Sequence, residues 1–420
     1  MKRISFAALT TALVLLSGCN KENDNLGSNE NLFIESETDV RFIKLGGKVA
    51  TTVSTRASVE SLDEVGQMGV FCLAARKTDV KNAEEAKDID WRQIVASPDE
   101  SESYGTTTNG IYWPNILCDV INNGSGYAIE PVTNATYYGY YPVTSWFGYD
   151  FYGYYPYQAE GFWSTSDSVL VDMTINGTQD VIWGKSETPD IAALTNDIEL
   201  QEKLGKCYYS ARYFRNHPNE IDDVHMKFDH LLTRFRFHVY PGANSESAAD
   251  KKYSEAASLC IKEIRLNQVE DNLRLVVADR SGNNREGKLY SYDENTTSFY
   301  LHHKDGARLS DRPVNIPTQT DSLGVVTPDT TVVGDCIMVL PERSAYYMSV
   351  VLADTANHDK TYSSERNITI ALNAAQSRKF EAGKTYNVYL RVTGVTMIGI
   401  TAELERWEES EEELDFIEFN

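Results

Sequence analysis

The chain has 420 residues, of which 62 are Asp or Glu and 39 are Lys or Arg, so its formal net charge at neutral pH is −23. This charge argues against nucleic acid and anionic membrane surfaces as partners. The six cysteines lie far apart without a Cys-x-x-Cys pair, which disfavours a disulfide framework and a zinc site and favours buried single thiols.

The N-terminus predicts a lipoprotein signal. A basic start precedes the apolar run from Ile4 to Leu16, which is too short to span a bilayer as a permanent helix. Small residues then lead into Cys19, which would become the lipid-bearing N-terminus after signal peptidase cuts. An ordinary signal peptide with an accidental cysteine is the alternative. We expect residues 1–18 to be a signal peptide, Cys19 to be lipidated, and the precursor to be held at the cell outer membrane.

The next part of the chain predicts a tether followed by strands. Residues 20–30 are polar, and two apolar segments within 31–53 predict a strand pair, the second turning at Gly46-Gly47. The apolar pattern from Val65 to Ala74 is typical of a buried strand. Further strand and turn patterns lie at 110–115, 137–157, 167–175 and 180–183, and a short helix is expected within 190–205.

The C-terminal half predicts strands almost throughout, separated by linkers rich in Gly, Asn, Asp, Ser and Thr. The predicted fold class is therefore all-β, with antiparallel β-sandwiches rather than alternating βαβ units. Polarity rises and Pro218 interrupts the pattern near 211–223, so we expect domains at 57–220 and 221–420. The strand patterns lie at 223–240, 259–267, 272–278, 332–340, 346–353, 366–372, 386–393 and 395–407.

Five motifs follow one another along the chain. They are the lipid-attachment signal at Cys19, Thr55-Arg56-Ala57 after the first strand pair, Trp113-Pro114 upstream of Tyr140-Tyr141-Pro142, FDHLLTRFRF at 228–237, and FEAGKTY at 380–386 leading into two strands that end at Trp407. Each motif is weak alone, but the ordered set resembles the fimbrillin family, the pilins and fimbrial accessory proteins of the Bacteroidetes. The polar, partly acidic residues behind Cys19 also resemble the export signal of surface lipoproteins in that phylum.

The resemblance implies two transthyretin-like β-sandwich domains and assembly by strand exchange. It implies that a trypsin-like protease cuts after Arg56, so that Ala57 becomes the N-terminus and the segment 19–56, a lipid tether with an N-terminal strand, is removed. Independently of any family, loss of a strand exposes backbone groups and an apolar trough that a strand from another subunit can fill. The alternative is that Arg56 is an ordinary loop arginine.

The function that this resemblance implies is a structural and adhesive subunit of a surface fimbrium. Its partners would be other fimbrial subunits and host or bacterial surface glycans or proteins. Its location would be the cell outer membrane before processing and the extracellular fimbrium afterwards.

The C-terminal tail contains a candidate donor strand. In EESEEELDFIEFN, at 408–420, Leu414, Phe416, Ile417 and Phe419 could fill the pockets of a groove, although the acidic first half suits a solvated linker better. A stalk subunit needs a groove and a donor strand, a tip subunit needs only a groove, and an anchor keeps its lipid. Because the tail is short and the tyrosine-rich excursion is extra to a minimal pilin, we favour a tip or accessory subunit.

Residues 137–157 hold two near-copies of one aromatic motif. The first, Tyr137 to Pro142, lies where fimbrillins have an aromatic strand, so the resemblance implies a structural role for it. The second, Phe151 to Tyr157, either extends a hairpin that covers the sandwich or contributes to a contact patch for a sugar or a neighbouring subunit. That patch would consist of Trp146, Phe147, Tyr149 and Tyr152.

The sequence predicts no catalytic, cofactor or metal site. Asp99 to Ser103 has the spacing of an integrin-type metal site but lies in a polar loop, and His225 and His230, five apart on a predicted strand, face opposite ways. We therefore expect a protein that is not an enzyme. The rival hypothesis is a surface glycan-binding lipoprotein of a polysaccharide-uptake system, which would share the lipid signal and exposed aromatic residues but has no use for a removable strand.

Overall fold

The computed structural model is built almost entirely of β-strands. Among the described residues the helices are α1 (Ile191–Leu194), α2 (Ile198–Lys206), α4 (Ser254–Ala257) and the 3-10 turn η4 (Leu309–Asp311). This confirms the predicted all-β class with few short helices. The structure describes residues 45–49, 65–76, 91, 111–122, 127–132, 148–206, 208–210, 213–214, 224–243, 253–320, 326–363, 368–372, 379–395 and 397–405.

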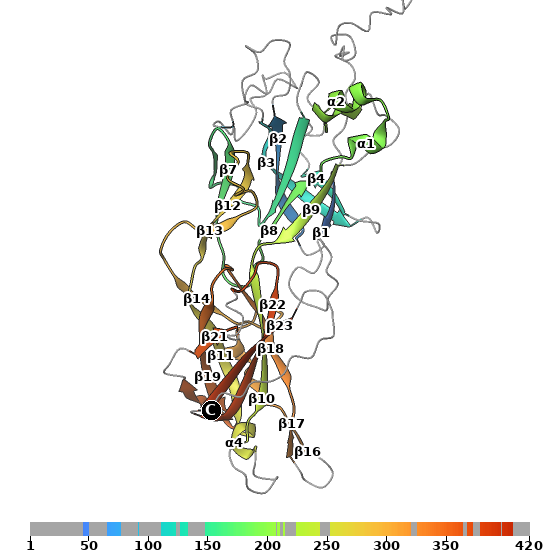
Figure 1. Ribbon diagram of the computed structural model, residues 1–420. Coiled ribbons are helices and arrows are strands. Elements are labelled where there is room, and N and C mark those ends of the chain that lie inside the picture. The colour runs from blue at the N-terminus through green and yellow to red at the C-terminus, as the bar shows by residue number, and fades with distance from the viewer. Residues whose placement is uncertain are drawn as a thin grey trace, which may run out of the picture.

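Seven strands close into a barrel, which lies in the upper part of Figure 1. Neighbouring strands are antiparallel except at one place, where β1 runs parallel to β9. The barrel order is β1 (Leu45–Val49), β4 (Tyr127–Pro131), β3 (Ile111–Asn122), β2 (Gln67–Arg76), β5 (Gly148–Tyr155), β8 (Ile182–Ser186) and β9 (Val224–His230).

Strand β5, which holds most of the second aromatic copy, is buried on both faces. Every residue from Gly148 to Tyr154 is buried. Tyr149 and Phe151 pack inside the barrel, whereas Tyr152 and Tyr154 pack against a second group of core residues outside it. A strand that carries apolar side chains on both faces needs a covering layer on both faces.

The second aromatic copy is therefore part of the interior. Tyr149 is fully buried and Tyr152 is 2% exposed, so the prediction that they belong to an exposed contact patch is wrong. The other two members of that patch, Trp146 and Phe147, lie outside the described residues, as does the first aromatic copy. The Tyr154 hydroxyl can be buried here because it is paired: it donates to Asn115 Oδ1 over 2.6 Å.

A four-stranded sheet covers the outer face of β5. Its inward side chains, including Val171 and Leu275, form one core with Tyr152 and Tyr154. We call it the covering sheet; its order is β13 (Leu289–Ser291), β12 (Asn272–Asp279), β7 (Ser168–Thr174) and β6 (Phe162–Ser164). Strands β6 and β7 come from the N-terminal half of the chain, whereas β12 and β13 come from the C-terminal half. The covering sheet is therefore assembled from both halves of the sequence.

Strands β12 and β13 form an arm that extends from the C-terminal half. Strand β11 (Leu259–Val269) pairs with β14 (Thr297–Tyr300), and their continuations β12 and β13 pair with each other. The arm is fixed to β7 by a bidentate ion pair, in which Arg274 Nε and Nη2 lie 2.6 and 2.7 Å from the carboxylate of Asp172. It is fixed to β8 by the Trp183 indole, which donates to the Val277 carbonyl over 2.8 Å.

Strand pairing runs across the predicted domain boundary at 220/221. Strand β9 lies beyond that boundary but pairs with β8 of the barrel, with Ile182 opposite His230. Strand β12 pairs with β7 over most of its length. The sheets therefore do not divide at residue 220, and the two domains with those limits stay a prediction.

The C-terminal half is a sandwich, whose two sheets lie in the lower part of Figure 1. One has the order β18 (Thr331–Val339), β10 (Thr233–Pro241), β22 (Thr385–Gly394) and β23 (Met397–Glu405). The other has the order β14, β11, β19 (Ala345–Asp354) and β20 (Asn357–Ser363), with β15 (Val314–Asn315) and β21 (Ile368–Ala371) at its ends. A separate hairpin joins β16 (Thr318–Thr320) and β17 (Val326–Pro328).

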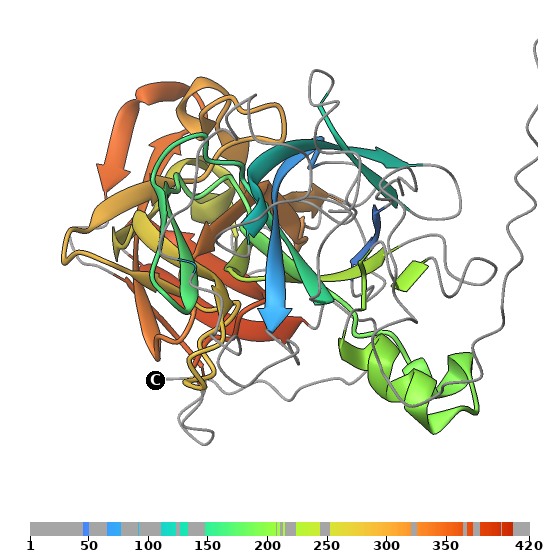
Figure 2. The ribbon, with the colours of Figure 1, turned by 90° about the horizontal axis from the view of Figure 1, so that it is seen from above.

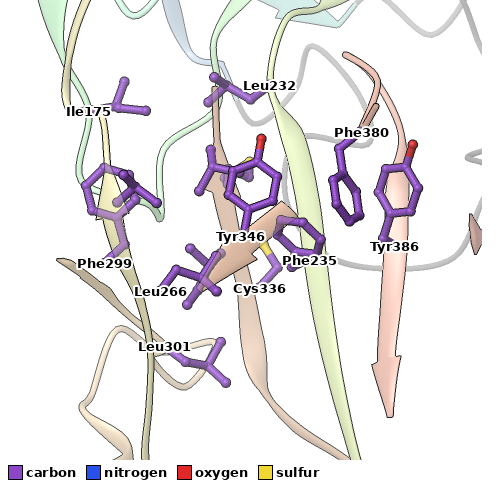
Figure 3. Close-up of a cluster of buried hydrophobic side chains, with 14 of the residues drawn as sticks. Ile175, Leu232, Phe235, Leu266, Phe299, Leu301, Cys336, Tyr346, Phe380 and Tyr386 are labelled. Atoms are coloured by element: carbon purple, nitrogen blue, oxygen red, sulfur yellow. The ribbon is translucent and has the colours of Figure 1, made fainter. Parts of the chain in front are cut away.

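Aromatic side chains fill the space between these two sheets. Phe235 lies at the centre, with its ring centroid 5.1 Å from those of Tyr346 and Phe380 and 6.0 Å from that of Tyr386. Figure 3 shows Phe235 and Tyr386 of one sheet near Tyr346 and Leu266 of the other. Offset and edge-on contacts of this kind stabilise a core beyond the area that they bury.

The helical excursion follows the barrel strand β8. It confirms the helix expected within 190–205, and its second helix begins where Asp197 Oδ1 accepts the amides of Glu199 and Leu200, over 3.0 and 3.2 Å. Figure 2 shows both helices at one edge of the molecule. Within the described ranges, no helix combines the length and the apolar character needed to cross a membrane.

Two further expectations can be compared with the structure. The turn predicted at Gly46-Gly47 is wrong, because β1 continues through both glycines. The expectation of buried single thiols is confirmed for Cys72, Cys118, Cys260 and Cys336, while Cys207 lies outside the described residues.

We expect Gly184→Ala to destabilise the barrel by about 1–3 kcal/mol, measured by urea unfolding. A Cβ at this position would lie 2.4 Å from Phe228 Cδ1 and 2.5 Å from the Lys227 carbonyl oxygen, and the backbone atom cannot rotate away. Gly205→Ala in α2, where a Cβ would meet nothing within 4 Å, is the matched control and should be neutral or stabilising by up to about 1 kcal/mol. Equal effects of the two substitutions would contradict this packing.

We expect Asp279→Asn to weaken the arm in a pH-dependent way. Burial of this carboxylate opposes its ionisation, but hydrogen bonds, the strongest from Ser281 and Arg285, outweigh it and lower its pKa from 3.8 to about 2. A lowered pKa stabilises the fold above pH 3.8, and this contribution disappears as the pH falls towards 2.

The wild type should therefore exceed the variant in free energy of unfolding by about 2 kcal/mol at pH 6, with the difference vanishing near pH 2. Unfolding is followed across this range in denaturant. Asp359→Asn, which removes an exposed carboxylate from β20, is the control. A difference between wild type and Asp279→Asn that does not depend on pH would rule out this explanation.

Candidate strand-exchange site

Strand β1 closes the barrel and is the most distinctive feature of the site. It pairs antiparallel with β4, where Leu45 lies opposite Ile129, and parallel with β9, where Leu45 lies opposite Val224. The other six strands are joined in a continuous antiparallel series from β4 to β9. Removal of β1 would therefore open the barrel at a single seam and leave β4 and β9 as its two edges.

Strand β1 pairs through its backbone with both neighbours, from Leu45 to Gly47 with β4 and from Leu45 to Val49 with β9. Leu45 is the buried side chain that anchors it, 4% exposed, in one core with Ile129 and Val224. Gly46 lies close to β9, because a Cβ there would be 3.2 Å from His225 Nδ1. The absence of a side chain at Gly46 therefore leaves room for the His225 ring beside β1.

The trough beneath β1 is lined by the apolar interior of the barrel. Val224, Met226 and Phe228 of β9 point inwards at every second position, and Ile129 faces them from β4. Phe228 lies deepest, packed against Gly153 and Gly184, where a Cβ would come within 2.8 and 2.4 Å of its ring. The trough therefore has alternating apolar positions that match the side-chain period of an incoming strand.

An aromatic group after α2 packs into the same core. Tyr209, Tyr213 and Phe214 contact one another with ring centroids 5.2 to 6.4 Å apart, and Tyr209 reaches Phe151 of β5 at 6.5 Å. These rings belong to the barrel core. The described side chains thus fill the interior of the barrel.

The ionisable groups of the barrel do not indicate catalysis. Burial raises the pKa of the Cys72 and Cys118 thiols, so both stay protonated near neutral pH and are poor nucleophiles. Burial also raises the pKa of Asp150. The Lys185 ammonium, 3.5 Å away, and the Tyr208 hydroxyl, 3.0 Å away, act in the opposite direction and limit this rise. This group has the character of a structural ion pair at the edge of β5.

Of the residues predicted to act in processing and assembly, the structure describes none. Cys19, Arg56, Ala57 and the tail residues Leu414, Phe416, Ile417 and Phe419 lie outside the described residues, as does the acidic loop at 99–103. His230 lies with its Nδ1 2.6 Å from Asp180 Oδ2, and His225 is exposed on the other face of β9. In the described part of the chain, no group of three His, Cys, Asp or Glu side chains is placed to hold a metal ion.

Sequence reasoning expected a removable strand in this segment but did not place one continuous strand across Gly46 and Gly47. The glycine pair suggested a turn, yet Leu45, Gly46 and Gly47 together carry the signal of a strand that packs tightly against a neighbour. The relevant clue was that the apolar pattern continued on both sides of the glycines, through Ile43 and Val49.

Comparison with known proteins gave matches only among solved structures. No protein-family model and no curated protein sequence matches the chain. A proposed cell adhesion protein from Bacteroides uniformis is similar with a TM-score of 0.43 and 15% identity, over 87% of this chain and 98% of that one. A fimbrial protein from Bacteroides vulgatus is similar with a TM-score of 0.38 and 14% identity, over 87% and 99%.

The fimbrial anchor protein Mfa2 from Porphyromonas gingivalis is similar with a TM-score of 0.33 and 10% identity, again over 87% of this chain and 99% of that one. At such low identities and TM-scores, these likenesses assign no function to the chain.

We expect Leu45→Ala to loosen β1 without unfolding the barrel. The substitution removes the buried side chain that anchors the strand, and the six remaining strands stay paired with one another. Hydrogen exchange of the β1 amides should speed up by roughly tenfold or more, while the amides of β2 keep their protection. Ile198→Ala, at a site 70% exposed in α2, should change neither. A uniform loss of protection across the barrel would show that β1 is not a separable element.

Proposed function

We propose that the chain is a structural and adhesive subunit of a cell-surface fimbrium, exported as a lipoprotein through Cys19 and assembled by strand exchange. In this proposal a protease cuts between Arg56 and Ala57, β1 leaves with the segment 19–56, and a strand from another subunit fills the trough between β4 and β9. The observation that carries the proposal is the position of β1, upstream of Arg56 in the chain and closing the barrel in the fold.

Physical chemistry supports the exchange step. A barrel that loses one strand has unpaired N–H and C=O groups on β4 and β9 and an apolar trough between them. An incoming strand pairs these N–H and C=O groups with its own backbone, and its alternate side chains fill the trough. A strand longer than the five residues of β1, with several apolar side chains at alternate positions, would bury more apolar surface in the trough and bind more tightly.

The tail is the segment that bears on the position of the subunit in the fibre. Leu414, Phe416, Ile417 and Phe419 supply four apolar side chains for a donor strand, but only at the very end of an acidic segment. We propose a tip or accessory subunit, which needs a trough to accept a strand and needs no donor of its own. The cell outer membrane is then the location of the precursor and the fimbrium that of the mature subunit.

The rival hypothesis, a surface glycan-binding lipoprotein, predicts a different mature protein. It keeps its lipid, so its N-terminus stays at Cys19 and β1 stays in the barrel. Polymerisation requires that β1 be released. The mature N-terminus therefore distinguishes the two hypotheses without any assumption about a ligand.

We expect the mature surface protein to begin at Ala57 and the variant Arg56→Ala to keep the N-terminal segment. Mass spectrometry of protein released from the cell surface measures both. Fibres seen by electron microscopy should contain the wild-type subunit and lack the variant, because β1 still fills the trough. Arg76→Ala at the end of β2, which leaves Arg56 intact, is the matched control and should be processed normally.

A wild-type protein whose N-terminus is a lipidated Cys19 would refute cleavage. A second experiment truncates residues 414–420. A tip or accessory subunit should enter fibres without this tail, whereas loss of fibre growth beyond the truncated subunit would assign it to the stalk.

A further inference from the structure

The outer face of the covering sheet carries a group of exposed aromatic rings around one arginine. Trp163 of β6 is 39% exposed, Tyr290 of β13 is 38% exposed, and Tyr292, just beyond β13, is 41% exposed. The guanidinium carbon of Arg274 lies 5.0 Å from the ring centroid of Trp163 and 5.0 Å from that of Tyr292. Tyr290 lies directly opposite Arg274 in the β12–β13 ladder. We call these four residues with Asp172 the aromatic platform.

The platform is held rigidly by the fold. Asp172 binds Arg274 through two hydrogen bonds of 2.6 and 2.7 Å, and the two side chains are only 26% and 24% exposed. Cation–π contacts then fix the rings on either side of the guanidinium. Aromatic side chains that are already ordered lose little conformational entropy when a ligand binds to them. The opposite face of the same sheet is core, so the backbone below the platform cannot shift easily.

Hydrogen-bonding groups border the rings. Asn272, two residues before Arg274 on β12, donates from Nδ2 to Asp293 Oδ2 over 3.0 Å. The Thr174 hydroxyl donates to Asn272 Oδ1, also over 3.0 Å. Asn295 donates to the same Asp293 oxygen over 3.0 Å. The platform thus presents apolar ring faces beside carboxylate, guanidinium and amide groups, all on one side of one sheet.

The size of the platform argues against a protein partner. An aromatic side chain can bury about 150–250 Å² in total, so three rings that are about 40% exposed offer roughly 200–300 Å². A standard protein interface needs about 800 Å² on each partner. A small ligand that is itself apolar on its faces and polar at its rim fits the available area and the alternation of groups.

The charge of the site and of the chain further restricts the class of ligand. The Arg274–Asp172 pair is neutral as a unit, and the chain as a whole carries a net charge of −23, which repels polyanions. We propose that the aromatic platform binds a neutral oligosaccharide built of hexopyranose rings, with the C–H faces of the sugar stacked on Trp163 and Tyr292 and its hydroxyls bonded to Asp172 and Arg274. This site does not depend on cleavage at Arg56 or on polymerisation, so either proposal can fail alone.

Binding is tested with purified protein and a panel of neutral hexasaccharides of glucose, mannose, galactose and N-acetylglucosamine, by saturation-transfer NMR and tryptophan fluorescence. At least one should bind at millimolar concentration or below. Trp163→Ala and Tyr292→Ala should each weaken binding by about tenfold, since each removes one stacking surface. Trp163→Phe keeps a ring and should lose less.

Tyr347→Ala is the matched control, because Tyr347 on β19 is an equally exposed tyrosine, 38%, outside the platform. Its binding should equal that of the wild type, and all variants should unfold at the same temperature. The proposal is overturned if no neutral hexasaccharide binds at millimolar concentration, if Trp163→Ala binds as the wild type does, or if a heparin hexasaccharide binds better than every neutral one. Loss of self-association in Trp163→Ala with unchanged sugar binding would likewise overturn it, in favour of a subunit contact.

Discussion

The structure depends on one constraint: strand β5 carries large aromatic side chains on both faces, and each face has to be kept from water. Tyr149 and Phe151 require an interior on one side, and the barrel supplies it. Tyr152 and Tyr154 require a cover on the other, and the covering sheet supplies that. Burial of such rings is worth several kcal/mol in total, so an uncovered β5 would be a strongly destabilised and aggregation-prone surface.

This constraint explains why the arm exists. The N-terminal part of the covering sheet has only two strands, the three-residue β6 and the seven-residue β7. Strand β12, from the C-terminal half of the chain, pairs with β7 and widens the sheet. Its side chains Leu275 and Val277 join the shared core. The two halves of the chain are thus joined by a sheet and a continuous core, and Arg274, Trp183 and Asp279 fix the arm in register.

Much of this fold could be predicted from local patterns. The apolar alternation of β2, β7, β11 and β19 identified these strands, because the side-chain period of a strand is visible in a short window. The pairing of β7 with β12 could not be predicted, since it joins residues about a hundred positions apart and leaves no local trace.

The same difference between local patterns and long-range pairing applies to the candidate sites. The exchange site was anticipated through Arg56, but β1 was interpreted as containing a turn because two glycines more often mark a turn than a close approach of strands. The aromatic platform was not anticipated at all. Trp163 lies more than a hundred residues before Tyr290 and Tyr292 in the sequence, and only the covering sheet brings the three rings around Arg274. A dense run of tyrosines was the more visible signal, and it belongs to the core.

The two strands that complete the N-terminal part of the molecule differ in how they are held. β12 is bound by side chains as well as backbone: an ion pair, an indole hydrogen bond and a buried carboxylate that accepts the Ser168 hydroxyl over 3.0 Å. β1 has five residues, two of them glycine, and among its described side chains Leu45 is buried. Backbone pairing alone gives little discrimination between sequences, because every strand offers the same groups, whereas paired charges leave a large penalty when their partner is lost. In the proposed exchange, β12 is therefore the strand that stays and β1 is the strand that is replaced.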